Sequence, residues 1–315
     1  MTTVGIFAPS SSAKFIENNP LRYSYLKDNV INVYEHPQTL MLTAHTAGSI
    51  KDRINAIYDL LKDPKIDILM AYWGGANTNE LLPHLDFEMF KKYEKPIVGY
   101  SDTSALLLTV NKFAGIKTYM GPCGITFDKL SPFKYSLDYF KKVIIEKQKE
   151  VIINDSETYA DDEYWLKENP TKREIKKNEG RKIYKEGEAE GEILASNLQT
   201  LMVLAGTKYF PNLENKILFL EEEELQPTSM IHRFFTHLSE VCDLQKVKGI
   251  CIGRFCEKSG FSKDDPETFI YDRVFSSLNI PIIYNLDFGH SDPLFTIPIG
   301  GKCYINTKEN VIKFM

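Results

Sequence analysis

The stretch Ile97-Val98-Gly99-Tyr100-Ser101-Asp102-Thr103-Ser104-Ala105 is an apolar run that enters a Gly-x-Ser-Asp turn and continues into the apolar segment 105–110. We expect a strand over 97–100 and a helix through Phe113, with Ser101 at the turn between them. A serine at a strand-to-helix turn is held away from the backbone, beside the free N–H groups of the helix start, as acyl transfer requires. The stretch therefore predicts a serine hydrolase with Ser101 as its nucleophile.

The same stretch has a structural alternative. Thr103 stands where the nucleophile elbow of α/β-hydrolases has its second glycine, so the motif by itself is a weak signal. Ser101 could instead cap the helix, with its hydroxyl accepting a backbone N–H and Asp102 favoured by the helix dipole. Catalysis therefore requires a base from elsewhere in the chain.

The segments before this stretch predict an α/β fold. Val4–Ala8 and Ile66–Tyr72 have the pattern of buried strands, and Ile50–Leu61 between them has apolar residues at helical spacing. Strands that alternate with helices form parallel sheets covered on both faces. Ligands bind beyond the carboxyl ends of such strands, where Gly74-Gly75 and Ser101 would meet.

The segments after this stretch predict a second domain. Residues 154–186 are polar and charged, and their lysines and arginines, densest over 167–185, alternate with acids, which is typical of a solvated connection. We therefore expect an N-terminal α/β domain over 1–152, a linker or insert with a short hairpin over 153–186, and a C-terminal domain over 187–315. In the last domain we expect a strand end followed by a helix within 192–205, a helix over 229–238, and strands at 216–220, 249–253, 281–284, 303–305 and 311–312.

Composition excludes several classes of function. The chain has 315 residues, 43% of them hydrophobic and 26% charged, which is typical of a globular protein with a substantial core. A formal net charge of −5 argues against a nucleic acid polymer as partner, since such binders present a basic face. No run is long enough to span a membrane, and the N-terminus lacks the features of a secretory signal. We therefore expect a cytoplasmic protein with no membrane partner.

The cysteines do not predict a metal site. None of the five has the paired spacing of a zinc site or a disulfide framework, so we expect reduced, mostly buried thiols and neither a metal nor a cofactor. Cys123, within Gly121-Pro122-Cys123-Gly124, could be mistaken for a nucleophile, but no feature of the sequence lowers its pKa.

A general base can be sought among the six histidines. His290 lies in Asp287-Phe288-Gly289-His290-Ser291-Asp292-Pro293, directly after the expected strand over 281–284, and glycine-flanked loops at strand ends are well placed for a cleft. The other five lie on expected helices or in segments without this context: His36, His45, His84, His232 and His237.

A carboxylate would complete a triad by binding the second imidazole nitrogen. Glu221 ends the apolar run Ile217-Leu218-Phe219-Leu220, which places it at a strand end. Its neighbours Glu222, Glu223 and Glu224 are acidic too, so Glu222 could take the same role, or all four could form a solvated loop. The sequence therefore predicts a triad of Ser101, Glu221 and His290, with Glu222 as an alternative to Glu221.

Ordered motifs along nearly the whole chain resemble the LD-carboxypeptidase and microcin C immunity family of serine peptidases. The motifs are Ala8-Pro9-Ser10-Ser11, Trp73-Gly74-Gly75 with residues 79–86, Gly99-Tyr100-Ser101-Asp102, Gly187-Glu188-Ala189-Glu190-Gly191, Asn197-Leu198 with Thr200-Leu201, Leu218-Phe219-Leu220-Glu221, and Gly289-His290-Ser291-Asp292-Pro293.

This resemblance implies a fold and an active site. The implied fold is an N-terminal parallel-sheet domain similar to class I glutamine amidotransferases, followed by a C-terminal β-rich swivelling α/β domain, in a homodimer. The implied roles are Ser101 as nucleophile, Glu221 and His290 as its partners, and an oxyanion hole from backbone N–H groups near Gly75 and Asp102.

The resemblance also implies a substrate class. The insert resembles the microcin-immunity branch, in which an aromatic residue stacks on a nucleoside, so Trp165 is a candidate for stacking and Asn197 for contacting the substrate. A single tryptophan in a linker can also simply anchor it to the domain surface. The implied substrate is a small amide, either an aminoacyl nucleotide conjugate or the L,D peptide bond of a muropeptide. A non-catalytic protein that binds a small peptide or nucleotide, and a glutaminase-like hydrolase that uses Cys123, remain as alternatives.

Overall fold

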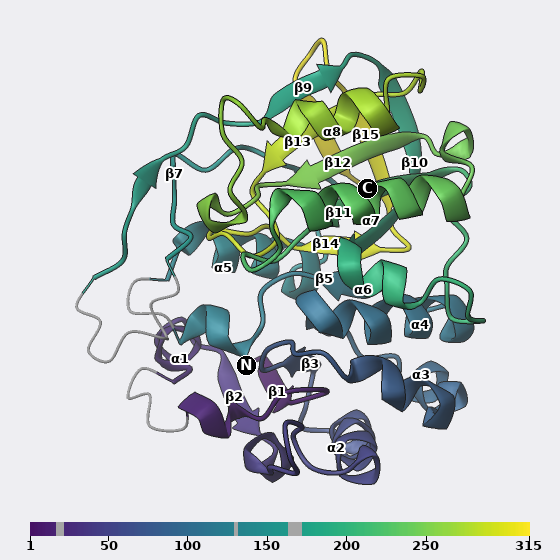
Figure 1. The fold of residues 1–315 in the computed structure, drawn as a ribbon. Helices are drawn as coiled ribbons and strands as arrows, with labels where there is room; N and C mark the ends of the chain where they lie inside the picture. Colours follow the sequence, from purple (N-terminus) through teal and green to yellow (C-terminus); the bar gives the residue numbers. More distant parts are fainter. Residues whose placement is uncertain (17–21, 129–131, 163–171) are drawn as a thin grey trace.

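The computed structural model describes residues 1–16, 22–128, 132–162 and 172–315, which form two sheets with helices around them (Figure 1). The first sheet lies in the lower half of Figure 1 and is built mainly from the N-terminal part of the chain. The second sheet lies in the upper half and is built mainly from the C-terminal part.

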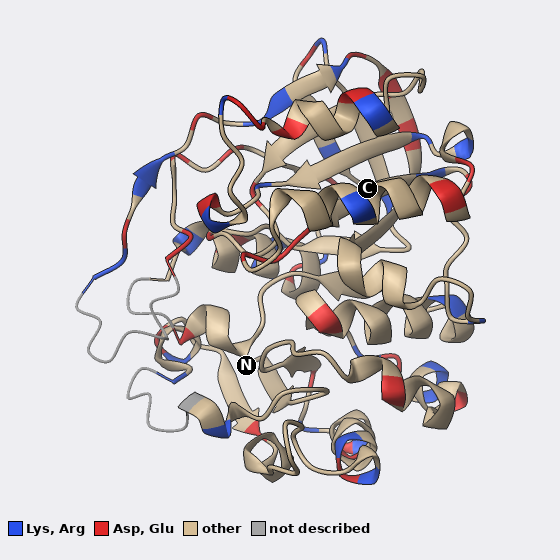
Figure 2. Ribbon diagram, viewed as in Figure 1, with Lys and Arg blue, Asp and Glu red and all other residues tan. Residues whose placement is uncertain are grey.

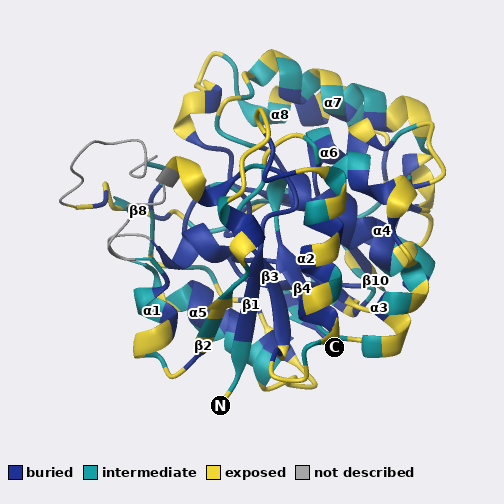
Figure 3. Ribbon diagram, turned by 90° about the horizontal axis from the view of Figure 1, so that it is seen from below, coloured by how far each residue is buried: buried dark blue, intermediate teal, exposed yellow. Residues whose placement is uncertain are grey.

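The first sheet has the strand order β14-β5-β4-β3-β1-β2. All neighbours from β5 to β2 pair in parallel, and β14 pairs antiparallel with β5. The central strands β1, β3 and β4 are nearly continuous buried apolar runs, as expected for a sheet covered on both faces, and Figure 3 shows them mostly in the buried colour, whereas the edge strand β2 is partly exposed. This confirms the predicted parallel sheet, whose strands are β1 Thr3–Phe7, β2 Asn32–Glu35, β3 Ile68–Ala71, β4 Ile97–Gly99, β5 Thr118–Met120 and β14 Ile297–Ile299.

Among the described residues, five α-helices accompany this sheet. α2 begins at a capping box in which Ser49 and Asp52 each accept a hydrogen bond from the other's backbone N–H, and it coincides with the helix predicted over 50–61. α4 begins directly after the Ser101 turn and is buried along most of its length, because it packs between the first sheet and the second. The helices are α1 Ser24–Asp28, α2 Ile50–Lys62, α3 Phe87–Tyr93, α4 Ser104–Ala114 and α5 Lys134–Phe140.

The second sheet has the strand order β6-β16-β15-β10-β11-β12-β13-β9. β10 to β13 pair in parallel, so their carboxyl ends meet at one edge, and the outer strands pair antiparallel. The strands are β6 Val151–Ile152, β9 Lys182–Lys185, β10 Glu188–Asn197, β11 Lys216–Glu221, β12 Gly249–Gly253, β13 Ile282–Leu286, β15 Lys302–Asn306 and β16 Val311–Phe314, and the helices are α6 Leu198–Val203, α7 Thr228–Val241 and α8 Glu267–Val274. A second, β-rich α/β unit is therefore present, as predicted.

The two halves of the chain exchange strands. β6, which precedes the insert, pairs with β16 in the second sheet, whereas β14, from the C-terminal half, pairs with β5 in the first. Within the insert, β7 Thr158–Tyr159 pairs antiparallel with β8 Lys176–Lys177, as the expected hairpin would, and β9 is an edge strand of the second sheet. The division at residues 152 and 186 remains a prediction.

The insert is less solvated than its charge pattern predicts. Figure 2 shows basic and acidic residues mixed along it, but the Arg173 and Arg181 side chains are only 1% and 3% exposed. Arg173 forms ion pairs with the buried Asp162 and Asp292, and Arg181 forms one with the partly exposed Asp155. The prediction of a solvated connection is therefore wrong for these two residues.

Two further expectations concern the cysteines and membrane-spanning helices. No disulfide joins the five cysteines, all of which lie in the described ranges, and all but Cys242 are buried, as predicted. Over the four described ranges, no helix combines the length and the apolar character needed to cross a bilayer.

Candidate active site

Ser101 occupies a strained turn between β4 and α4. Its φ angle is +59°, a left-handed conformation that costs a non-glycine residue about 1–3 kcal/mol. A Cβ atom on Gly74 would lie only 2.8 Å from both Cβ and Oγ of Ser101, so only glycine leaves room for this side chain. The alternative role as helix cap does not hold, because neither the 3-10 turn Ser101–Thr103 nor α4 receives a side-chain cap. Ser101 therefore has a strained backbone at the end of a central strand and does not cap the helix that follows.

The backbone beside Ser101 offers N–H groups. The position of a Cβ on Gly74 is 3.2 Å from the Asp102 nitrogen, which places this N–H next to the serine hydroxyl. The Asp102 carboxylate accepts the Thr78 N–H at 2.8 Å. Gly75 has φ +142° and packs against Ser10 so closely that a Cβ would not fit. Gly74, which precedes Gly75, lies against the Ser101 side chain, and the roles of Gly75 and Asp102 as oxyanion donors remain a prediction.

The loop after β13 brings His290 to Glu221. The distance from His290 Nδ1 to Glu221 Oε2 is 2.6 Å, and the Glu221 side chain is fully buried at the end of β11. The approach requires glycine at two positions: a Cβ on Gly289, whose φ is +107°, would lie 2.7 Å from Glu221 Oε2, and one on Gly253 would lie 2.9 Å from Glu221 Cβ. Glu221, and not its neighbour Glu222, is therefore the carboxylate in contact with the imidazole.

This contact determines the protonation of His290. Burial lowers the pKa of the imidazole, but the Glu221 carboxylate more than offsets that effect, and Glu224 and Glu222 add to it, so the pKa is raised from 6.5 to about 9. Because Nδ1 faces Glu221, Nε2 is the nitrogen left to exchange a proton with a substrate or nucleophile.

Tyr100 connects His290 with the serine turn. The Tyr100 ring, adjacent in sequence to Ser101, lies edge-on to the His290 ring with centroids 5.1 Å apart. The Asn197 N–H also donates to Ser104 Oγ at 3.2 Å, which joins the end of β10 to the start of α4. Within the part of the chain that the structure describes, no hydrogen bond joins the Ser101 hydroxyl to His290. Catalytic hydrogen bonds are often long before substrate binds, so this geometry does not exclude the predicted triad, which remains a prediction.

Asn197 holds a second buried carboxylate. Its Oδ1 accepts the Thr200 N–H at 2.9 Å and its Nδ2 donates to Glu222 Oε1 at 2.9 Å. Glu222 also accepts the backbone N–H groups of Gln199 and Glu223. Burial raises the pKa of Glu222 to about 7, and the neighbouring Glu221 adds to that effect. The Asn197 side chain therefore has a structural role, and its contact with substrate remains a prediction.

The remaining predicted residues differ in what can be said of them. Trp165 lies outside the described residues. The Cys123 side chain is 1% exposed, with its Sγ 3.7 Å from Thr126 Oγ1, so the thiol is packed into the core rather than presented to a cleft. Among the described residues, no group of three or more His, Cys, Asp and Glu side chains could hold a metal ion.

Sequence reasoning missed the groups that support the site. Ser10 Oγ accepts the N–H groups of Ala76 and Asn77 at 3.0 and 2.8 Å and fixes the loop after Gly75. Arg254 and Arg173 hold Asp287 and Asp292, the acids on either side of His290. The acids stood out in the loop motif, but an arginine that pairs with them across the fold has no sequence signal of its own.

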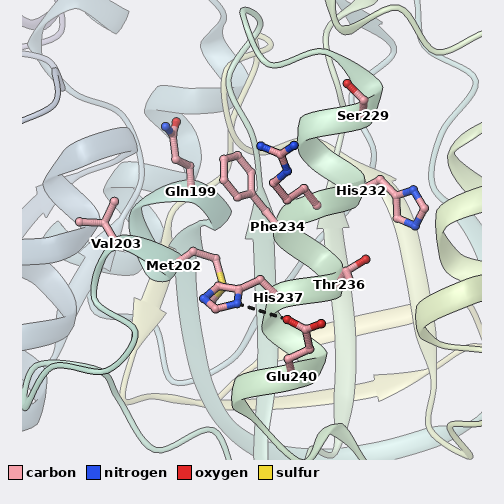
Figure 4. Close-up of a pocket in the computed structure, with 10 residues that line it drawn as sticks. Gln199, Met202, Val203, Ser229, His232, Phe234, Thr236, His237 and Glu240 are labelled. Carbon is pink, nitrogen blue, oxygen red and sulfur yellow. Dashed lines mark ion pairs between the residues drawn. The ribbon is translucent and has the colours of Figure 1, made fainter.

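A groove between α6 and α7 lies apart from these residues (Figure 4). Its volume is about 660 Å³, and Met202 and Phe234 from the two helices contribute apolar surface to it. His237 Nδ1 lies 3.6 Å from Glu240 Oε2 at one side of the groove. None of the predicted site residues lines it, so it is not the candidate active site.

Comparison with known proteins identifies the family. The family model of the LD-carboxypeptidase N-terminal domain matches residues 4–121, and the family model of the LD-carboxypeptidase C-terminal domain matches residues 190–305. The chain is also 35% identical over 259 residues to the putative carboxypeptidase YocD of Bacillus subtilis, a match that covers 82% of this chain and 78% of the relative. The fold is therefore that of a peptidase family, and the chain belongs to the LD-carboxypeptidase family.

Particular relatives extend the comparison. The microcin C7 self-immunity protein MccF of Escherichia coli is 28% identical, over 96% of this chain and 90% of that protein. The crystal structure of an MccF-like protein from Bacillus anthracis has a TM-score of 0.92 and 31% identity, over 100% of this chain and 96% of that one. A structure of MccF in complex with glutamyl sulfamoyl guanosine has a TM-score of 0.90 and 26% identity, with the same coverage.

Proposed function

We propose that this chain is a serine peptidase or amidase that hydrolyses a small amide through Ser101, His290 and Glu221. The observation that carries the proposal is the 2.6 Å contact between His290 Nδ1 and the buried Glu221, beside the strained Ser101 turn. A packing role would not require a mostly buried imidazole against a fully buried carboxylate next to a strained serine, because such groups are costly to bury.

The proposed mechanism follows from these positions. His290 Nε2 accepts the Ser101 proton, Ser101 Oγ attacks the amide carbonyl, and the backbone N–H groups of Gly75 and Asp102 stabilise the oxyanion. The imidazolium then donates its proton to the departing nitrogen. Water activated by His290 hydrolyses the acyl-enzyme, and Glu221 stabilises the imidazolium in both steps.

We propose an aminoacyl nucleotide conjugate as the substrate. MccF, which matches this chain over its full length, has been solved with glutamyl sulfamoyl guanosine, and a related protein from Streptococcus pneumoniae has been solved with AMP. By this analogy Asn197 contacts the aminoacyl part and Trp165 stacks on the base. The enzyme would act in the cytoplasm as a homodimer and would need no cofactor.

A muropeptide is the second candidate substrate. The family description that matches both halves of the chain is LD-carboxypeptidase, an activity that releases a terminal D-amino acid from an L,D peptide bond. Both substrates present a small amide to the same Ser101, so the arrangement of the three residues suits either reaction.

The test is hydrolysis of both compounds, a muropeptide tetrapeptide and an aminoacyl sulfamoyl nucleotide, by the wild type and by Ser101→Ala, with the products identified by mass. We expect cleavage of the nucleotide conjugate by the wild type and a loss of at least about 10³-fold in the variant. Cys123→Ala is the control and should retain activity. Release of D-alanine alone would transfer the assignment to the second candidate, and activity that survives Ser101→Ala would refute the triad.

A fluorophosphonate probe separates an enzyme from a binding protein. We expect it to label Ser101 in the wild type and to label neither Ser101→Ala nor His290→Gln. A wild-type protein that binds the nucleotide conjugate but is neither labelled nor active would be the non-catalytic alternative.

A further inference from the structure

The loop that carries His290 is held by two buried arginines, one on each side. Arg254 Nη2 donates to Asp287 Oδ1 at 2.6 Å, three residues before His290. Arg173 Nη2 donates to Asp292 Oδ2 at 2.9 Å, two residues after it. The side chains of these four residues are between 1% and 6% exposed, so the pairs are not surface ion pairs. Buried pairs of this kind fix geometry, because a carboxylate left without its partner would be strongly disfavoured.

Arg173 differs from Arg254 in the part of the chain from which it comes. Arg254 directly follows β12, in the same sheet as β13, from which the loop emerges. Arg173 belongs to the insert, and its Nε also donates to Asp162 at 2.8 Å, so one guanidinium connects an acid of the insert with an acid of the His290 loop. Ala160 and Asp292 exchange backbone hydrogen bonds at 2.8 and 2.9 Å, and Ser156 and Asn178 of the insert donate to Asp287, so the insert contacts the loop at both ends.

We propose that Arg173 is a positioning residue, which acts through Asp292 to keep the His290 imidazole in contact with Glu221. This inference rests on the proposed function for its kinetic consequence, but its structural content is independent of any substrate. Asp292 is two residues from His290, so a shift of its carboxylate moves the imidazole relative to Glu221, where the separation is 2.6 Å. A misplacement of about 1 Å can cost a catalytic group about 100-fold in rate.

The direction in which the pKa of His290 changes when Arg173 is replaced distinguishes a positioning role from a purely electrostatic one. The groups that raise the pKa of the imidazole are Glu221, at the end of β11, and Glu224 and Glu222 beside it, whereas burial lowers it. Tyr100 packs on its ring. If Arg173→Gln removed only a positive charge, the pKa of His290 would rise. If it releases the loop and weakens the Glu221 contact, the pKa falls instead.

The experiment is NMR titration of the imidazole resonances in the full-length protein, with His290 assigned from His290→Gln, in the wild type, Arg173→Gln and Arg173→Lys. Arg181→Gln is the matched control: Arg181 is a buried arginine of the same insert that pairs with Asp155 through Nε at 2.6 Å. We expect a lower pKa for His290 in Arg173→Gln, a smaller decrease in Arg173→Lys, because lysine cannot bind two carboxylates in the same fork, and no change in Arg181→Gln.

The kinetic readout is kcat per fluorophosphonate-labelled site on the substrate that the wild type hydrolyses. We expect Arg173→Gln to lower kcat by at least about tenfold with KM nearly unchanged, and Arg173→Lys to restore part of it. A higher pKa for His290 in Arg173→Gln, or wild-type titration and kcat in both variants, would overturn the proposal. Should the wild type hydrolyse neither substrate, the proposed function fails, while the titration still decides the positioning role. If Arg173→Gln does not fold, Arg173→Lys carries the same test.

Discussion

Replacing Glu221 with glutamine should move the pH at which the enzyme becomes active. The pKa of His290 is raised from 6.5 to about 9, chiefly by Glu221, against the opposing effect of burial. One pKa unit corresponds to about 1.4 kcal/mol, so the net stabilisation of the imidazolium is about 3 kcal/mol. A general base must be unprotonated to accept the Ser101 proton, so wild-type kcat/KM should rise about tenfold per pH unit below pH 8 and level off near pH 9.

In Glu221→Gln the main opposition to burial is gone, so the midpoint of the acidic limb should fall below 6.5. The maximal rate should fall as well, because the imidazolium formed in the transition state has lost its carboxylate. The assay is the pH profile of kcat/KM for the hydrolysed amide in both proteins, with Ser101→Ala as the blank. An acidic limb at the same pH in both proteins would refute the assignment of Glu221 as the partner of His290.

The same contact makes stability depend on pH. Because the folded protein binds the His290 proton more tightly than the unfolded chain, this stabilisation is complete below pH 6.5 and is lost as pH rises through about 9. The free energy of unfolding from denaturant titrations should therefore fall by up to about 3 kcal/mol across this window, and Glu221→Gln should remove the decrease.

Three further predictions follow from the site. Gly74→Ala places a Cβ 2.8 Å from Ser101 Oγ and should lower kcat by about tenfold or more, as steady-state kinetics with the fold checked by circular dichroism would show; unchanged kinetics would mean that the turn yields. Cys123→Ala should keep wild-type turnover, and iodoacetamide should not inhibit the wild type or the variant through this position, since the thiol is buried. Lost turnover in the variant would favour the thiol mechanism. The pKa of Glu222 is raised from 4.5 to about 7, so its contribution to stability is complete below pH 4.5 and is lost as pH rises through 7. In Glu222→Gln the free energy of unfolding should depend less on pH between these limits. The same pH dependence in both proteins would contradict the raised pKa.

Much of the fold was predictable because its strands are long or buried enough to leave a pattern. β12 occupies the predicted residues 249–253, and α2 and β11 differ from the prediction by one residue. The prediction omitted β5 and β14, which have three residues each; β5 pairs with β4, and β14 pairs with β5 from a distant part of the chain. Short strands have no measurable period, so their assignment depends on tertiary contacts.

The candidate site divides in the same way. Glu221 and His290 were identifiable from their places at the ends of apolar runs, and the structure brings them together. The choice between Glu221 and Glu222 was not decidable from sequence, because consecutive residues at a strand end point to opposite faces and only the position of the loop decides which one meets it. Arg173 appeared as part of a solvated charge run, because burial of a charge depends on partners that are far away in sequence.

The exchange of strands limits how the proposed triad can close. Ser101 follows a strand of the first sheet and His290 follows a strand of the second, so a swivel of one whole half against the other would change their separation. Such a swivel would also break the pairing of β14 with β5 and of β6 with β16, since each half contributes a strand to the other's sheet. Because backbone hydrogen bonds lost from a buried ladder are costly, smaller movements are favoured. Because two buried arginine pairs hold the 287–293 loop, we expect the Ser101 to His290 hydrogen bond to form by movement of the Ser101 and Tyr100 side chains when substrate binds.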